Sequence, residues 1–176
     1  GPRVCFFCRW LMIYLSSYPS PLGKIILAAN DSSLIGAWFE GQKYFMQGLK
    51  DESLVYEDTV ELKKARAWLD DYFAGRKPEI SRLKLAPKGS DFALSIWELL
   101  KEIPYGKTTT YGELAKIYAA RHGLRKMSAQ AVGGAVGHNP LSIIVPCHRV
   151  VGSDGSLTGY AGGIEIKTFL LNHEKN

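Results

Sequence analysis

Apolar residues in the first part of the chain fall in short runs that are typical of β-strands. β-Branched and aromatic residues fill 13–18, 24–29 and 34–40, and Pro, Gly, Asn, Asp and Ser fill the intervals between these runs. Turn-forming residues between short apolar runs indicate hairpins. We therefore predict three antiparallel strands here.

The apolar spacing becomes helical between residues 59 and 74. Apolar side chains recur there at intervals of three and four, and glycine and proline follow the segment. This spacing predicts a helix with one apolar face, which is able to cover one face of the sheet. We interpret Trp68, Tyr72 and Phe73 as core residues, so this half of the chain offers no catalytic cluster.

A connection rich in Lys, Arg and Pro follows at 77–89, with a short strand predicted at 83–86. Ser90 or Asp91 is expected to cap a helix that runs through Leu100. The remaining pattern is mainly helical, and it ends in a predicted helix over 164–173.

Two short helices are predicted in the middle of this second half. Thr110 and Glu113 form a capping box for a helix to about residue 118, and Ser128 begins a second helix to about residue 136. Two helices joined by a compact basic turn have the outline of a helix-turn-helix. The second helix contains small, uncharged residues, which let a backbone approach a DNA groove or another helix closely.

These elements predict an α+β chain with two domains. The first, residues 12–88, is a small antiparallel sheet with a covering helix, and the second, residues 89–176, is mainly helical. Met12 looks like a natural start, so we interpret residues 1–11 as an extension outside the fold.

Charge is distributed unevenly along the chain. The net charge is +5, and the apolar and charged contents of 46% and 22% are those of a soluble globular protein. Residues 103–151 alone sum to +5, six cations minus one anion, which suits a polyanion such as nucleic acid. A solvated basic face is the alternative, and charge does not decide between them. The residues counted are Lys107, Lys116, Arg121, Arg125, Lys126, Arg149 and Glu113.

Cysteine usage favours a reducing compartment. Cys5, Cys8 and Cys147 are odd in number and lack the spacing of a disulfide framework. Cys5 and Cys8 have the spacing of half a zinc or redox motif, but no second pair accompanies them, so we expect no metal. No apolar run reaches the roughly 18 residues of a membrane span. We expect a cytoplasmic protein, associated with the nucleoid if it is prokaryotic, and no membrane partner.

The candidate chemistry lies in the stretch from residue 143 to residue 151, where Pro146, Cys147, His148 and Arg149 stand between β-branched runs. Proline breaks an extended strand, so Cys147 is expected on a bend. A neighbouring His or Arg lowers the pKa of a thiol and makes it a nucleophile. The alternative is an unreactive cysteine of the hydrophobic core, but the flanking Pro146, His148 and Arg149 favour a reactive one.

These residues resemble the O6-alkylguanine-DNA alkyltransferase family. The resemblance is strong over residues 90–174 and extends over residues 13–89 only in general pattern. Several motifs in one order are more specific than any one of them. The motifs are Ile103-Pro104-Tyr105-Gly106, Thr110-Tyr111-Gly112-Glu113-Leu114-Ala115, Gly133-Gly134-Ala135, Asn139-Pro140, Pro146-Cys147-His148-Arg149-Val150, Gly159-Tyr160-x-Gly162-Gly163 and Leu171-x-His173-Glu174.

The resemblance implies a ribonuclease H-like first domain and a second domain like a winged helix-turn-helix. The implied activity is that of a methylated-DNA–protein-cysteine S-methyltransferase. Such a protein repairs DNA by direct reversal, moving the alkyl group of O6-alkylguanine, and also of O4-alkylthymine, irreversibly to Cys147. The thioether product has no facile hydrolytic exit, so each molecule acts once, and no cofactor is required.

The resemblance also implies residue roles. Cys147 accepts the alkyl group, and His148 relays its proton through water towards Glu174. Asn139 holds the active-site segment, and Tyr111 rotates the nucleotide and helps to protonate the departing base. The buried thiol requires the base to be flipped out of the duplex.

The implied substrate pocket is lined by small and aromatic residues: Val150, Tyr160, Ala161, Gly162 and Ser142. Because Gly162 and Ser142 are small, we expect groups bulkier than methyl, such as benzyl, to be accepted.

The implied partner is double-stranded DNA that carries O6-alkylguanine. We expect a monomer, with cooperative assembly along DNA as an open alternative. Many family members have an arginine at the position of Gln130, which therefore predicts base flipping with less electrostatic help. The predicted DNA contacts are Thr110, Arg121, Arg125, Lys126, Ser128, Ala129, Gln130, Ala131, Gly133 and Arg149.

Two rival functions remain to be tested. A non-catalytic helix-turn-helix protein that binds lesions is the first, but alkyltransferase-like proteins of that kind lack the cysteine that stands here at Cys147. A hydrolase with a Cys147–His148 dyad is the second, and it leaves the helix-turn-helix pattern unexplained.

Overall fold

The computed structural model describes residues 12–49 and 53–176. The predicted extension, with Cys5 and Cys8, lies outside the described residues. Over the described part of the chain, no helix is both long and apolar enough to cross a membrane.

A four-stranded sheet forms the N-terminal half, in the order β3-β2-β1-β4. β1 (Met12–Ser20), β2 (Gly23–Ala29) and β3 (Leu34–Phe39) pair antiparallel, which confirms the three predicted strands. β4 (Ser53–Tyr56) was not predicted, and it pairs parallel with β1. This strand has four residues and is mostly exposed, and its short run Leu54-Val55-Tyr56 lacks the alternation of a half-buried strand.

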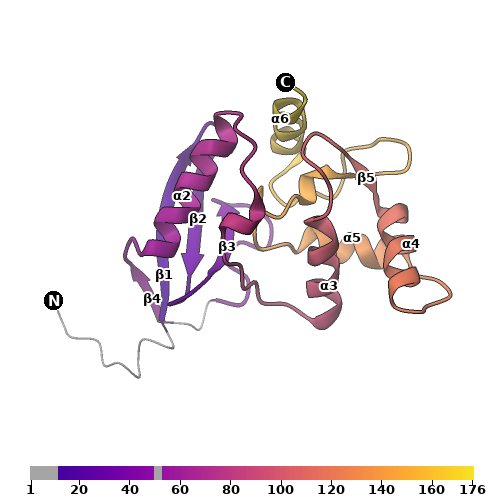
Figure 1. The fold of residues 1–176 in the computed structure, drawn as a ribbon, viewed down its shortest axis with the longest axis horizontal. Coiled ribbons are helices and arrows are strands. Elements are labelled where there is room, and N and C mark those ends of the chain that lie inside the picture. The colour runs from indigo at the N-terminus through magenta and orange to yellow at the C-terminus, as the bar shows by residue number, and fades with distance from the viewer. Residues whose placement is uncertain (1–11, 50–52) are drawn as a thin grey trace.

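Helix α2 (Val60–Phe73) covers one face of the sheet, as Figure 1 shows at the left of the molecule. It agrees with the predicted helix over 59–74. Its buried residues recur at helical spacing and pack into the main core. They are Leu62, Ala65, Trp68, Leu69 and Tyr72.

The free edge of β3 holds two later segments of the chain. Leu34 forms a parallel bridge with Leu85, so the strand predicted at 83–86 is reduced to one bridge. Ala37 bridges Leu141 in the same way, since its amide donates to Pro140 O at 2.7 Å and its carbonyl accepts from Ser142 N at 2.9 Å. The segment that leads to Cys147 thereby extends the N-terminal sheet.

The second half is mainly helical, as predicted. Helix α3 (Asp91–Leu100) follows the short 3-10 helix η1 (Ile80–Arg82), and its capping residue Ser90 accepts from Ala93 N. The remaining helices are α4 (Tyr111–Arg121), α5 (Ala129–Gly137), the 3-10 helix η2 (Cys147–Arg149) and α6 (Ile164–Lys175). In Figure 1, α4 and α5 lie at the right of the molecule and α6 lies at the top.

The predicted helix-turn-helix caps are both formed. Thr110 Oγ1 accepts from Glu113 N, and Ser128 Oγ accepts from Ala131 N. A small parallel pair, β5 (Thr109–Thr110) and β6 (Val150–Val151), ties the start of α4 to the end of η2. The cysteine and the predicted DNA-binding helices are therefore linked through backbone pairing.

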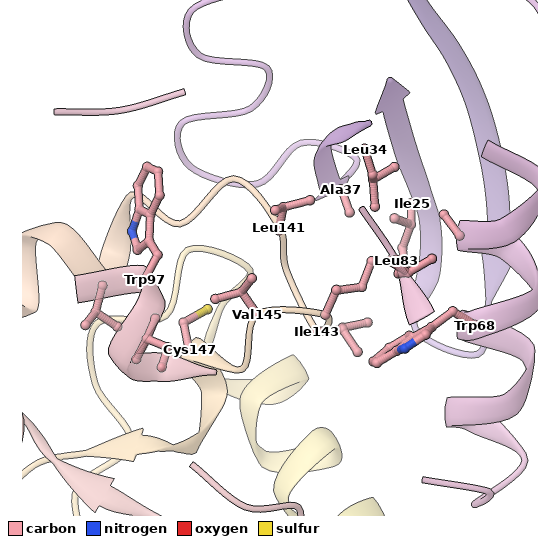
Figure 2. Packing of buried hydrophobic residues seen from close by; sticks show 14 of the residues in the cluster. Ile25, Leu34, Ala37, Trp68, Leu83, Trp97, Leu141, Ile143, Val145 and Cys147 are labelled. Atoms are coloured by element: carbon pink, nitrogen blue, oxygen red, sulfur yellow. The ribbon is translucent and has the colours of Figure 1, made fainter. Parts of the chain in front are cut away.

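One cluster of buried residues runs through both halves of the chain. Figure 2 shows it from Trp68 and Leu83, through Leu141, Ile143 and Val145, to Cys147. Trp97 joins the helices within it, because its indole nitrogen donates to Ala135 O at 2.8 Å. The halves therefore share a core, and their division into domains at 12–88 and 89–176 stays a prediction.

We predict that Leu141→Ala destabilises the protein by about 2–5 kcal/mol, because it leaves a cavity at a fully buried position between the two halves. Urea unfolding measures the free energy directly. Leu124→Ala is the matched control, and because Leu124 is 44% exposed its expected effect is within about 0.5 kcal/mol. Equal effects for the two variants would contradict a shared core at Leu141.

Candidate active site

Cys147 lies on a bend, as predicted. It begins η2 directly after Pro146, and its amide donates back to Val145 O at 2.8 Å. The residue is 6% exposed, so its side chain is buried in the protein. Burial raises the pKa of the Cys147 thiol, although a hydrogen bond from Asn139 and the charge of Lys167 act in the opposite direction. The resting sulfur is therefore protonated and needs a base before it can attack.

Asn139 fixes the segment that precedes the cysteine. Its Nδ2 donates to Leu141 O at 3.3 Å and to Val145 O at 2.8 Å, and its Oδ1 accepts from Leu141 N at 3.0 Å. Ile143, between these anchors, has a φ of 71°, a conformation that is costly for a β-branched residue. These contacts fix the main chain on both sides of Ile143, and the role of Asn139 in the reaction stays a prediction.

His148 offers a base within the same 3-10 helix. Its Nε2 contacts Glu174 Oε2 at 2.5 Å, while its Nδ1 is buried and has no hydrogen-bond partner among the described residues. Burial lowers the pKa of His148 overall, although Glu174 raises it. A neutral imidazole that donates from Nε2 leaves the Nδ1 lone pair free to take a proton.

The Glu174 carboxylate collects donors from several parts of the fold. Arg149 donates from Nε to Oε1 at 2.7 Å and from Nη2 to Oε2 at 3.3 Å, and Gly106 N donates to Oε1 at 3.2 Å. The Tyr72 hydroxyl donates to Oε2 at 2.7 Å. Burial alone raises the pKa of Glu174, but His148 and Arg149 hold it well below its ordinary value. The group is therefore an anion in the folded protein.

The predicted DNA contact of Arg149 is wrong. Its guanidinium is buried against Glu174, and Nη1 donates to Ile103 O at 2.7 Å. A buried carboxylate requires a countercharge, and the arginine next to the catalytic segment supplies it. The sequence showed a cation beside the cysteine but not the anion that it neutralises.

Lys167 and Tyr72 are the site residues that the sequence interpretation missed. Lys167 is buried, and its Nζ donates to Val150 O and to Thr158 O. A signal existed for Lys167, because it shares one face of α6 with Leu170 and Glu174 at spacings of three and four. Tyr72 carried no signal beyond that of a core aromatic residue.

The predicted pocket residues lie close to this cluster. Ser142 Oγ is buried and contacts Gln42 Oε1 at 3.2 Å, and Val150 is buried beside Lys167. The Tyr160 hydroxyl is buried without a partner among the described residues. A cavity of about 400 Å³ is lined by Tyr160, Ala161, Gly159 and the glycines of α5. A larger apolar cavity of about 540 Å³ lies between β3, α3 and α5, and neither cavity is lined by Cys147, His148 or Glu174.

Gly162 is required by close packing. A Cβ atom at this position would lie 2.9 Å from Tyr160 Cε1 and 3.4 Å from Phe39 Cδ2. The Tyr160 ring would therefore have to move for any larger residue. The absence of a side chain at Gly162 therefore leaves space for the ring of Tyr160, which lines the predicted pocket.

Tyr111 stands at the start of α4, where its hydroxyl donates to Thr158 O at 2.9 Å. Burial raises the pKa of Tyr111, so the phenol is protonated. Its ring lies beside Gly133 of α5 and under Gly159. This arrangement joins both predicted DNA-binding helices to the loop that borders the pocket.

The other predicted DNA contacts divide into two groups. Thr110 and Ser128 cap helices, and Arg121 forms an exposed ion pair with Glu102 at 2.6 and 2.9 Å. The remaining residues form an exposed surface at the turn and along α5, where Gly133 is half-buried. They are Arg125, Lys126, Ala129, Gln130, Ala131 and Gly133. No cluster of three or more His, Cys, Asp or Glu side chains in the described ranges is placed to hold a metal ion.

Comparison with known families identifies the class of protein that this fold and cysteine site represent. Residues 13–87 match the ribonuclease-like domain of 6-O-methylguanine DNA methyltransferase, and residues 91–176 match the DNA binding domain of the same protein. The chain belongs to this family, which confirms the resemblance seen in its motifs.

Individual relatives agree over nearly the full length. A methylated-DNA–protein-cysteine methyltransferase of Methanosarcina acetivorans is 44% identical, with 92% of this chain and 98% of the relative covered. The Haemophilus influenzae protein of that name is 40% identical, with 93% and 87% covered. The crystal structure of Mycobacterium tuberculosis OGT in complex with DNA aligns with a TM-score of 0.78 at 38% identity, covering 93% of this chain and 92% of that one. The predicted α+β fold is thereby confirmed.

We predict that Glu174→Gln lowers the free energy of unfolding at neutral pH by about 3–5 kcal/mol, because it leaves Arg149 buried without its anion. The folded-state pKa of Glu174 lies below its ordinary value of 4.5. Its stabilisation is therefore fully present above that value and is lost as the pH falls towards the folded-state pKa. The variant should lose less stability than the parent on acidification.

Urea unfolding over a pH series measures both effects. Glu102→Gln is the control, because it removes a carboxylate from an exposed arginine pair of similar geometry. Surface pairs contribute little, so this variant should follow the parent closely. A Glu174→Gln curve that parallels that of the parent would contradict the assignment of a buried anion.

Proposed function

We propose that this protein repairs alkylated DNA directly, by moving the alkyl group of O6-alkylguanine to the sulfur of Cys147 in one irreversible step. The observation that carries the proposal is the buried series Cys147, His148 and Glu174, in which His148 Nδ1 has no hydrogen-bond partner among the described residues. Membership of the 6-O-methylguanine DNA methyltransferase family supports the substrate class.

Proton removal comes first in this mechanism. The Cys147 thiol passes its proton through a water molecule to His148 Nδ1, and the Nε2 proton of His148 is held by Glu174. Because Glu174 is anionic, it stabilises the imidazolium that forms. The charge of Lys167 favours the resulting thiolate.

Alkyl transfer then follows by a single displacement. The thiolate forms a bond with the alkyl carbon while the bond from that carbon to guanine O6 breaks. The bonding electrons pass to guanine, which takes a proton, and the Tyr111 hydroxyl is the proposed donor. The proton held by His148 then returns through solvent to the Tyr111 phenolate, so both side chains recover their resting state. The products are restored guanine and a Cys147 thioether, so each molecule reacts once without a cofactor. O4-alkylthymine presents the same kind of carbon and is a proposed second substrate.

The base must leave the duplex to reach a sulfur that is this deeply covered. We assign the exposed small residues of α5 to the DNA groove, with Arg125 and Lys126 near the phosphates. Gln130 stands exposed on α5 and takes the place of the flipped base in the stack. The protein acts as a monomer on double-stranded DNA in this proposal.

The first test is the intact mass of the protein after incubation with an O6-methylguanine oligonucleotide. We expect a gain of one methyl group, once per molecule, on Cys147. Cys147→Ser should gain no mass and should leave the lesion in place. A lesion-binding protein without chemistry would gain nothing, and a hydrolase would remove the group repeatedly, so either outcome would refute the proposal.

The second test concerns Gln130. We expect Gln130→Arg to raise the rate of transfer from duplex DNA several-fold, because a cation adds electrostatic help during flipping. The rate with the free base O6-benzylguanine should not change, since no flipping is needed. Identical duplex rates for variant and parent would remove the assigned role of Gln130. Failure of benzylguanine to label the parent would count against a pocket that admits groups larger than methyl.

A further inference from the structure

Tyr72 connects the N-terminal half of the protein to the proton relay. It lies on α2 and is 1% exposed, and its hydroxyl donates to Glu174 Oε2 at 2.7 Å across 102 positions of sequence. The same oxygen contacts His148 Nε2 at 2.5 Å. Donors from opposite halves of the fold therefore meet at one carboxylate oxygen, which also accepts from Arg149 Nη2 at 3.3 Å.

The shared oxygen gives the tyrosine hydroxyl two physical effects on the relay. A donor at Oε2 withdraws negative charge from the atom that faces His148, so it weakens the hold of Glu174 on the relay proton. The same bond restricts rotation of a carboxylate that sits in the last turn of α6. His173 adds to the connection, because its Nε2 contacts Tyr72 O at 2.7 Å and so joins the end of α2 to α6.

We propose that Tyr72 is a positioning residue for alkyl transfer, with its hydroxyl holding Glu174 Oε2 against His148 and limiting the basicity of that oxygen. The proposal rests on the proposed function, because it concerns the same cysteine. It makes α2, which showed no catalytic pattern in the sequence, part of the reactive site.

Other charged and titratable groups surround these three residues and stay in place when the hydroxyl is removed. Arg149 keeps its ion pair with Glu174, and His173 bonds the main chain of Tyr72 rather than its side chain. Burial, followed by the charge of Glu174, raises the pKa of Tyr72, so the phenol stays protonated throughout the neutral range. Among the described residues these groups come from η2, α6 and the segment before β5, and they are Arg149, Lys167, His173 and Tyr105.

The test is the pH dependence of the single-turnover transfer rate for Tyr72→Phe, measured at saturating methylated oligonucleotide. We expect the rate at neutral pH to fall about tenfold, in line with the loss of other outer hydrogen bonds that orient a site. Because Glu174 then holds the His148 proton more tightly, the acid limb of the profile should move upward by about half to one pH unit.

Tyr18→Phe is the matched control. It removes a tyrosine hydroxyl that donates at 2.6 Å to Asp70, a carboxylate of α2 that is hydrogen-bonded to none of Cys147, His148 and Glu174 in the described part of the chain. This variant should keep the rate and the pH profile of the parent. An equal shift in both variants would overturn the proposal, and so would a slower Tyr72→Phe protein whose profile is unshifted and whose only change is a lower melting temperature.

Alkylation of the parent protein and the effect of Tyr72→Phe are separate outcomes. If the parent protein gains no alkyl group, the proposed function is wrong. If the parent is alkylated and Tyr72→Phe retains its rate and profile, only the role of Tyr72 is wrong.

Discussion

The buried carboxylate of Glu174 is the group on which the site depends. An anion that is shielded from water is stable only when donors and a countercharge surround it, and here Arg149, His148, Tyr72 and the amide of Gly106 do so. These donors come from both halves of the chain. Glu174 therefore has all of its hydrogen-bond donors only when the sheet and the helical half are packed together. Folding of the two halves and assembly of the proton relay are coupled for this reason.

The edge of the sheet explains how the nucleophile is held. An exposed edge strand offers unpaired amides and carbonyls, and β3 satisfies its own with the segment on the way to Cys147. Asn139 then closes that segment on itself by bonding the main chain at Leu141 and Val145. A reactive group on an irregular segment thus has the rigidity of a sheet, which precise attack on a single carbon requires.

Local features could be predicted from the sequence, and long-range ones could not. The helix starts at Thr110 and Ser128 were correct, because a cap depends on residues within one turn. β4 was missed, since its partner lies about forty positions away in β1. Arg149 was wrongly assigned to DNA and Tyr72 was assigned only to the core, because their roles arise where distant segments meet. The motif around Cys147 indicated the chemistry, but it did not indicate the residues that hold Glu174 in place.

The protonated resting state of the Cys147 sulfur protects a protein that is consumed by its own reaction. Oxidants and small electrophiles in a cell react with exposed thiolates, and the burial that raises the pKa of Cys147 withholds that form. This matters for a protein that reacts only once, because a molecule whose Cys147 has been oxidised by peroxide is no longer able to repair DNA. The need to deprotonate the thiol before attack therefore protects unused molecules from these reagents.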